Sequence, residues 1–251
     1  MLINQTIDKL NQMKFFGLVK GLEDQAQMSE IVSLSFEERL SLLIDCEFTY
    51  RANKKVARLL REAKLKSSGC LEDLDFSSSR GLDKSFIASL SSFNWLENHH
   101  NIIICGATGV GKTYLACAFG NGACRKGFKT LYYRIPKLLE EVSISRADGS
   151  YIRLMGKFGR TSLLILDDWG LSSLSEIQAK DLLEIIEECQ GKCGVIIAGQ
   201  LPIQDWHQMI SNPTVADAIL DRLVHNAYKL NLKGESMRKT YAKVEAIAAT
   251  L

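Results

Sequence analysis

The octapeptide Gly106-Ala107-Thr108-Gly109-Val110-Gly111-Lys112-Thr113 matches the pattern G-x-x-x-x-G-K-[ST]. Glycines let such a loop wrap around a phosphate so that successive backbone N–H groups point inward, and the following helix adds its positive N-terminal end. Lys112 then reaches the β- and γ-phosphates, and the Thr113 hydroxyl binds Mg²⁺. The octapeptide is not a dinucleotide fingerprint, because Thr108 stands where the second glycine would be. We therefore expect all eight residues to bind a nucleoside triphosphate.

A second motif lies downstream, where the apolar run Leu163 to Leu166 ends in Asp167 and Asp168. A buried strand of this kind delivers the acids at its end to the ligand edge of a sheet. We expect Asp167 to hold Mg²⁺ through water and Asp168 to orient or deprotonate the attacking water. Taken alone, the motif also fits a solvated strand end; its pairing with the phosphate loop favours the functional interpretation.

Unbroken apolar runs alternate with helical segments from about residue 99 onward. This order predicts a parallel sheet covered by helices on both faces. The expected strands are 101–105, 129–135, 162–166, 194–198 and a slim 228–232, and the first two expected helices are 113–126 and 136–145.

The first 66 residues contain only helical patterns. Ser35 and Glu38 fit a capping box that opens a long helix, and apolar side chains follow at helical spacing. We place the end of this helix at Ser67-Ser68-Gly69 and a linker within 67–81. The expected organisation is a helical partner- or DNA-binding domain over 1–67 and an ATPase domain over 68–251.

The composition is that of an ordinary globular chain of 251 residues with a net charge of +2, which excludes disordered and fibrous classes. Its charge is uneven: residues 1–50 hold 4 basic and 8 acidic side chains, whereas 51–66 hold 7 basic and 1 acidic. The 7 cysteines form no CxxC pair, so buried reduced thiols are expected rather than a metal site. No stretch is apolar enough to span a membrane and no signal pattern opens the chain, so we expect a cytoplasmic protein.

The order of these elements resembles the AAA+ ATPases, and most closely the IstB-type ATPases of bacterial insertion sequences, which are similar to the DnaC helicase loaders. The resemblance covers nearly the whole chain. It rests on the phosphate loop, on Leu166-Asp167-Asp168-Trp169-Gly170-Leu171, and on the blocks 216–225 and 232–239. It implies an α/β P-loop fold with a parallel sheet, a small all-α N-terminal domain and a reduced C-terminal lid.

The resemblance also implies roles for residues outside the two motifs. Gln200 falls at the position of a polar sensor near the γ-phosphate, where Asn or Thr is usual. Arg222 falls at the arginine-finger position, which completes the site of a neighbouring subunit, and Arg238 matches a second sensor arginine. The alternatives are a surface ion pair between Asp221 and Arg222 and a helix-capping role for Arg238. Many relatives carry Glu at position 168, and because Asp is shorter we expect slow ATP hydrolysis.

Two basic stretches are candidate DNA contacts. For the first, residues 51–66, the alternatives are a solvated helix face and a dock for an acidic protein surface such as that of the transposase. The second follows the helix expected at 136–145, and in the AAA+ assemblies that the chain resembles this region faces the central channel. Contacts of this kind bind phosphates without reading sequence. The candidates are Lys54, Lys55 and Arg58 in the first stretch, and Arg146, Arg153 and Lys157 in the second.

By resemblance, we expect an ATP-dependent DNA-binding regulator of transposition that requires ATP and Mg²⁺. It forms a homo-oligomer on duplex DNA with ATP between subunits, selects the target site and recruits or stimulates a partner transposase, and hydrolysis dissolves the assembly. A replicative helicase loader of the DnaC type is the alternative with the same ATPase core. A small-molecule kinase is a third, although the sequence shows neither a substrate lid nor an acceptor pocket.

Overall fold

A computed structural model describes residues 2–28, 31, 33–76 and 81–237. The chain divides into two compact units, Met1–Arg58 and Leu59–Leu251, which are described separately. The functional domain boundary between residues 67 and 68 stays a prediction.

The first unit is helical, as expected. It holds α1 (Leu2–Gln12), α2 (Phe16–Gln27) and most of α3 (Phe36–Ala63). The capping box is confirmed, since the Ser35 N–H donates to Glu38 Oε2 at 2.8 Å and the Glu38 N–H donates to Ser35 Oγ at 3.2 Å. The helix ends at Ala63, earlier than expected, because the next residue, Lys64, adopts a left-handed conformation with φ of 52°.

Helices α2 and α3 approach each other closely at glycines of α2, beside a ring contact between Phe16 and Tyr50. A Cβ added at Gly17 would lie 2.5 Å from the Cα of Glu47, and Glu47 accepts a hydrogen bond from the Leu18 N–H at 3.1 Å. Several apolar side chains in the first half of α3 are exposed, among them Phe36 at 67 % and Phe48 at 75 %. Among residues 4–28, 31 and 33–58, the buried positions are Gly17, Gly21 and Glu47.

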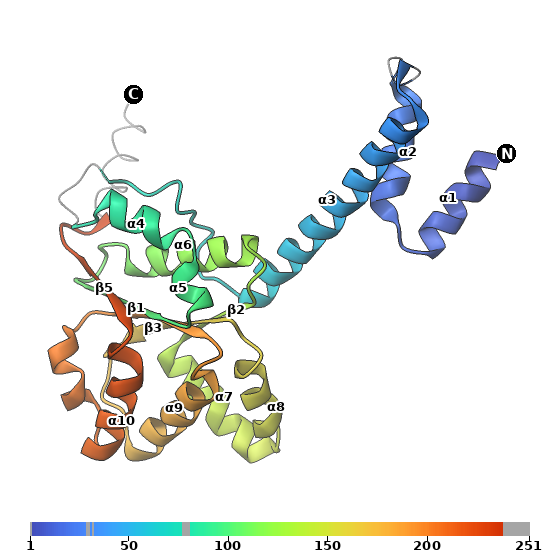
Figure 1. Ribbon diagram of the computed structural model, residues 1–251. Coiled ribbons are helices and arrows are strands. Elements are labelled where there is room, and N and C mark those ends of the chain that lie inside the picture. Colours follow the sequence, from blue (N-terminus) through green and yellow to red (C-terminus); the bar gives the residue numbers. More distant parts are fainter. Residues whose placement is uncertain (1, 29–30, 32, 77–80, 238–251) are drawn as a thin grey trace, which may run out of the picture. The chain divides into compact units, whose positions relative to one another are not determined.

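The second unit is built on a five-stranded sheet in which all neighbouring strands are parallel, in the order β2-β3-β4-β1-β5 (Figure 1). The expected strands are confirmed. They are β1 (Asn101–Gly106), β2 (Thr130–Arg134), β3 (Leu163–Trp169), β4 (Gly194–Gly199) and β5 (Ala227–Leu232).

Helices cover both faces of this sheet, as expected for a parallel sheet whose central strands are apolar (Figure 1). One face carries α4 (Lys84–Leu90), α5 (Asn94–Glu97) and α6 (Lys112–Arg125). The other carries α7 (Ile135–Asp148), α8 (Tyr151–Phe158), α9 (Glu176–Cys189) and α10 (Pro213–Val224), with two short 3₁₀ turns, Ile203–Asp205 and His207–Met209, before α10.

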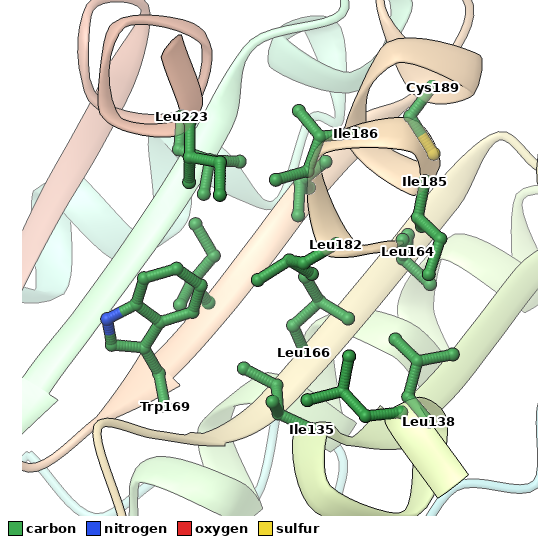
Figure 2. Close-up of a cluster of buried hydrophobic side chains, with 14 of the residues drawn as sticks. Ile135, Leu138, Leu164, Leu166, Trp169, Leu182, Ile185, Ile186, Cys189 and Leu223 are labelled. Carbon is green, nitrogen blue, oxygen red and sulfur yellow. The ribbon is translucent and has the colours of Figure 1, made fainter. Parts of the chain in front are cut away.

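The larger of the two cores lies between the sheet and helices α7 to α10. Figure 2 shows Leu164 and Leu166 of β3 close to Ile135 of α7 and to Leu182 and Ile186 of α9, all of them buried. Burying an aliphatic side chain of this size stabilises a fold by about 1.5–3 kcal/mol, so this core holds β3 firmly. The acids at the end of β3 are thereby carried on a rigid strand.

The strand order determines where a ligand can bind. Strands β1, β3 and β4 are neighbours in the middle of the sheet, and their carboxyl ends meet at one edge. Ligands of open parallel sheets bind outside the carboxyl ends of the strands, near the point where the strand order reverses. The phosphate loop follows β1, so it lies at this edge.

The segment expected to be a linker is only in part a loose connection. Residues 67–76 form no helix or strand, but Leu74 is buried, and a Cβ added at Gly69 would lie 2.7 Å from the Tyr114 ring of α6. This segment therefore packs on α6 instead of crossing solvent. Small residues allow a close backbone approach as well as a flexible link, so the composition of Ser67-Ser68-Gly69 fits both.

Two further expectations concern the cysteines and the membrane. Five of the seven thiols are buried, Cys70 is half-buried and Cys46 is exposed, and all seven are free. Within the described ranges, every helix is too short or too polar to cross a bilayer.

Candidate nucleotide-binding site

The loop between β1 and α6 needs glycine at defined places. Gly109 has φ of 87°, and a Cβ added there would lie 2.2 Å from the hydroxyl oxygen of Ser236. Gly111 has φ of 102° and caps the N-terminus of α6. Both conformations are in the left-handed region that side chains rarely adopt. The sequence thus produces a tight loop that presents backbone to a ligand.

Lys112 lies across this loop. Its Nζ donates to the carbonyl oxygens of Gly106 at 2.7 Å and Ala107 at 2.8 Å. The Met237 N–H donates to the carbonyl of Gly109 at 3.0 Å, so the chain beyond β5 also borders the loop. A positive charge held at a loop that follows a strand and opens a helix is suited to binding phosphate.

Asp167 is the centre of the polar network at the end of β3. It is 2 % exposed, and its Oδ2 accepts hydrogen bonds from Thr113 Oγ1 at 2.8 Å and from the Tyr132 hydroxyl at 2.7 Å. Burial and the adjacent carboxylate raise the pKa of Tyr132, so its hydroxyl remains a donor at neutral pH. A hydroxyl and a carboxylate held this close form an oxygen donor set that fits Mg²⁺.

Asp168 has an unusual backbone. The register of β3 against β4 shifts between Leu166 and Trp169, and Asp168 between them has φ of 62°, a conformation that Asp and Asn tolerate better than most residues. The strand therefore continues beyond the expected end at Leu166 through a bulge. The carboxylate of Asp168 forms an ion pair with Arg134 of β2.

Gln200 follows β4 directly, at the position expected for the polar sensor. Its Oε1 accepts a hydrogen bond from the Thr108 hydroxyl at 2.9 Å. The longer Gln side chain thus reaches the phosphate loop.

These groups border one cavity of about 270 Å³. It is lined by Lys66, Thr108, Gly109, Gly111, Lys112, Thr113, Tyr114, Asp167, Asp168, Ala198, Gly199, Gln200 and Met237. The structure thus brings together the loop, the acid pair and Gln200. The arrangement can hold a triphosphate, a divalent cation and a water next to a carboxylate.

The residues at or near this cavity that were not among the sequence candidates include four with polar side chains: Lys66, Tyr114, Tyr132 and Arg134. Tyr132 and Arg134 could have been found from strand alternation, because residues two apart on β2 point to the same side and β2 pairs with β3. Lys66 comes to the cavity through the packing of residues 67–76 on α6, which has no sequence signal.

Arg222 lies at the other edge of the sheet. Its backbone carbonyl accepts a hydrogen bond from the side chain of Asn101, the first residue of β1, whereas the phosphate loop follows the last residue of β1. Its guanidinium pairs with Glu187 of α9 at 3.0 Å rather than with the adjacent Asp221. Arg222, the arginine-finger candidate, therefore does not border the cavity of its own chain. Arg238, the second-sensor candidate, lies outside the described residues.

The candidate DNA contacts of the second unit differ in their surroundings. Arg146 pairs with Asp181 at 2.7 Å and with Glu184 at 3.1 Å, so two acids offset its charge. Lys157 of α8 donates to the Tyr133 hydroxyl at 2.5 Å, and Arg153 is exposed. In the first unit, the candidates Lys54, Lys55 and Arg58 are all exposed on α3.

Comparison with known proteins gives concordant results. The IstB-like ATP binding protein family matches residues 8–245 of the chain. The insertion sequence ATP-binding protein y4pL of Sinorhizobium fredii is 46 % identical over 95 % of this chain and 98 % of its own length. The IS1162 ATP-binding protein of Pseudomonas fluorescens is 45 % identical over 80 % of this chain and 88 % of its own length.

Solved structures share the fold of about two thirds of the chain. The crystal structure of DnaI aligns with a TM-score of 0.59 at 20 % identity, over 70 % of this chain and 94 % of that one. The DnaC helicase loader aligns with a TM-score of 0.56 at 20 % identity, over 68 % of this chain and 100 % of that one. With its phosphate loop, its acid pair and a family match over nearly its full length, the chain belongs to the IstB-like ATP binding proteins of insertion sequences.

Proposed function

We propose that this protein is a Mg²⁺-dependent ATPase that assembles on duplex DNA and regulates transposition by selecting the target site and recruiting or stimulating a partner transposase. The ATPase activity is proposed because Thr113, Asp167 and Asp168 line one cavity. There, Thr113 Oγ1 lies 2.8 Å from Asp167 Oδ2. The regulatory part is supported by membership of a family whose relatives are named insertion sequence ATP-binding proteins.

The chemistry follows from the residues at the cavity. The loop N–H groups and Lys112 bind the phosphates, and Thr113 with Asp167 would hold Mg²⁺, which neutralises charge developing on the β- and γ-phosphates. Asp168 accepts a proton from a water whose oxygen bonds to the γ-phosphorus. The bond from that phosphorus to the β–γ bridging oxygen breaks, the electron pair leaves with ADP, and the products are ADP and phosphate. Asp168 then returns the proton to solvent.

The assembly part depends on the separation of Arg222 from the phosphate loop of its own chain. The backbone carbonyl of Arg222 accepts a hydrogen bond from Asn101, the first residue of β1, whereas the phosphate loop follows the last residue of β1. A strand of six residues spans roughly 20 Å. A guanidinium at that edge can complete a site only in a neighbouring subunit, where it would stabilise the charge of the transferred phosphoryl group. Nucleotide that binds only between assembled chains stabilises the assembly, and hydrolysis removes that stabilisation. Arg238 would read the γ-phosphate within its own chain.

DNA binding is proposed for the exposed cations Lys54, Lys55, Arg58 and Arg153, together with Lys157 and Arg146. Such side chains neutralise phosphates without reading bases, so we expect binding that does not depend on DNA sequence and weakens steeply with salt.

Sedimentation of the full chain with duplex DNA and a non-hydrolysable ATP analogue tests the assembly. We expect a complex of several chains that requires both ligands and that the Lys112→Ala variant does not form. A chain that stays monomeric with both ligands present contradicts the proposal.

Mixing two inactive variants tests whether Arg222 acts between subunits. Arg222→Ala retains its loop and Lys112→Ala retains its arginine, so their mixture should regain part of the turnover that each lacks. Lys180→Ala, which removes an exposed cation of α9, is the control and should resemble wild type. Full turnover by Arg222→Ala alone would contradict the finger role.

Two measurements separate the alternatives. Phosphate release without a phosphorylated product excludes a small-molecule kinase. Capture of a replicative helicase instead of a transposase by the full chain would favour a loader of the DnaC type.

A further inference from the structure

Three acceptors hold the guanidinium of Arg222. Its Nε donates to Gln190 Oε1 at 3.2 Å, one terminal nitrogen donates to the carbonyl of Ala218 at 2.8 Å, and the other donates to Glu187 Oε1 at 3.0 Å. Every nitrogen of the group is therefore engaged once, by atoms of α10, of α9 and of the residue that ends α9. A long, flexible side chain is fixed in a single orientation.

The backbone of Arg222 is held as firmly. Asn101, which is 6 % exposed, donates through Nδ2 to the carbonyls of Arg222 at 3.0 Å and of Leu223 at 3.1 Å. Its Oδ1 accepts from the Val195 N–H at 2.9 Å. These bonds satisfy carbonyls at the end of α10 that lack partners within the helix, and they fasten α10 to β1 and β4.

Folding alone does not account for the contacts of the guanidinium. The side chain of Glu187 is 48 % exposed and that of Arg222 is 26 % exposed, and an ion pair this open to solvent contributes little to stability. Ordering a long side chain costs free energy on binding, and a side chain that is ordered beforehand avoids this cost. The contacts are thus suited to preparing Arg222 for a ligand.

The guanidinium also keeps capacity for a ligand. A guanidinium carries five N–H groups, and the three hydrogen bonds use three of them. Arg222 and Gln190 line a cavity of about 550 Å³ together with polar residues such as Asn98, His99 and Asn226. An anionic group that enters this cavity can meet the remaining donors.

We infer that Glu187 and Gln190 are positioning residues, which hold Arg222 in the orientation in which it acts on the triphosphate of a neighbouring chain. Neither residue touches the nucleotide; both act through Arg222. The inference rests on the proposed ATPase function with its site between subunits, and it adds the residues that preorganise the finger.

A mixture of two inactive full-length variants tests the inference, because it separates the chain that binds ATP from the chain that supplies the arginine. Arg222→Ala supplies the loop and Lys112→Ala supplies the arginine. Glu187→Gln, added to the chain that supplies the arginine, should lower the kcat of the mixture about fivefold, the factor expected for a partly exposed ion pair. KM for ATP should change little, because the loop that binds ATP is on the other chain. Gln190→Ala should have a smaller effect of the same kind.

Two controls isolate the positioning role. Glu188→Gln is the same substitution at the next residue of α9, where the carboxylate pairs with Lys192 instead, and it should leave the kcat of the mixture unchanged. Glu187→Gln placed on the Arg222→Ala chain should also have no effect, because that chain has no arginine to position. A role in folding alone would lower turnover from either chain.

The outcomes distinguish the inference from the function on which it rests. If the mixture of Arg222→Ala and Lys112→Ala regains no turnover, the intersubunit site itself fails. If the mixture regains turnover and Glu187→Gln on the Lys112→Ala chain is as fast as Glu188→Gln, the positioning role fails while the proposed function stands. Equal losses from Glu187→Gln on either chain would likewise overturn the inference.

Discussion

The hydroxyl of Thr113 donates to Oδ2 of Asp167 across 2.8 Å, although the two residues lie 54 positions apart in the chain. This contact joins the helix that follows the phosphate loop to the strand that carries the acid pair. Its two oxygen atoms are the donors that a Mg²⁺ ion would require.

Removing the hydroxyl of Thr113 should weaken metal binding while the protein still folds. We expect Thr113→Ala to weaken Mg²⁺-dependent nucleotide binding by about tenfold, because a buried carboxylate loses a hydrogen bond and the metal loses a ligand. Thr113→Ser keeps the hydroxyl and should bind like wild type. Titration of a fluorescent ATP analogue with Mg²⁺ and with EDTA measures both. Equal affinity of the two variants would show that the hydroxyl is not a ligand.

Asp168→Asn should abolish turnover but not binding. Removal of a general base costs roughly 10²–10⁴ in rate. Asn tolerates the left-handed φ of 62° at this position, so the bulge should survive the substitution. Rapid-quench measurement of hydrolysis and a nucleotide-binding titration together show whether turnover is lost while binding is kept. If Asp168→Asn kept kcat within about twofold of wild type, another group would have to accept the proton.

Gly109→Ala should prevent nucleotide from binding to the phosphate loop, and Gly149→Ala serves as the control for backbone strain alone. Gly109 has φ of 87° and faces Ser236, whereas Gly149 has φ of 76° and an added Cβ would meet no atom within 4 Å. Both Ala variants incur the strain of a left-handed residue, about 1 kcal/mol, but only Gly109→Ala should also lose nucleotide binding. Thermal melting with and without ATP distinguishes the two effects, and an equal response of both variants to ATP would contradict the role of Gly109.

The indole rings of Trp169 and Trp206 should support both stability and turnover. Their centroids are 4.7 Å apart, Trp206 is fully buried, and Trp169 directly follows Asp168. Trp206→Ala should lower the free energy of unfolding by about 3–5 kcal/mol. Trp206→Phe should lose less and keep kcat closer to wild type, because a ring still supports the bulge. Urea denaturation measures the first quantity and steady-state hydrolysis the second. Equal stability of Trp206→Ala and Trp206→Phe would show that an aromatic ring at position 206 does not stabilise the fold.

Thiol reactivity should report the packing of α6. Burial raises the pKa of Cys117 and of Cys124, so little of either is thiolate at neutral pH. We expect iodoacetamide to modify exposed Cys46 rapidly, and to reach these two only as the pH rises or the fold opens. Mass spectrometry of timed digests measures the order, and early labelling of Cys117 would contradict the buried position of α6.

Much of the second unit could be predicted from the sequence because its central strands β1, β3 and β4 begin with continuous apolar runs and its phosphate loop is a local pattern. The runs around Ile103 and Ile165 have no other stable place than the centre of a sheet. The loop needs only glycines, a lysine and a hydroxyl in a fixed order, so it carries its own signal.

The contacts of the acid pair could not be predicted in the same way. Arg134 meets Asp168 only because β2 and β3 pair in one register, and a shift by one residue would send Arg134 to the opposite face. The bulge at Asp168 has no sequence marker, since Asp is common both at strand ends and in left-handed turns. The side-chain partners of Arg222 are Glu187 of α9 and Gln190, which ends that helix. Both are more than thirty positions away, so spacing along the chain favoured Asp221 instead.

The exposed side chains of α3 show the converse limit. Helical spacing of Phe36, Leu40, Ile44 and Phe48 predicts a helix correctly, yet all four are exposed in the structure. A periodic apolar pattern tells which face of a helix is apolar without telling what covers it.

The division of the chain after Arg58 falls inside the continuous helix Phe36–Ala63. Truncation at that division would cut the helix, and the backbone N–H and C=O groups at the cut would lose their partners within the helix. A fragment cut there would also expose α3 at a point where no cap exists. Genetic dissection of this protein is therefore better done by point substitution than by deletion, and a fusion tag is better attached outside residues 36–63.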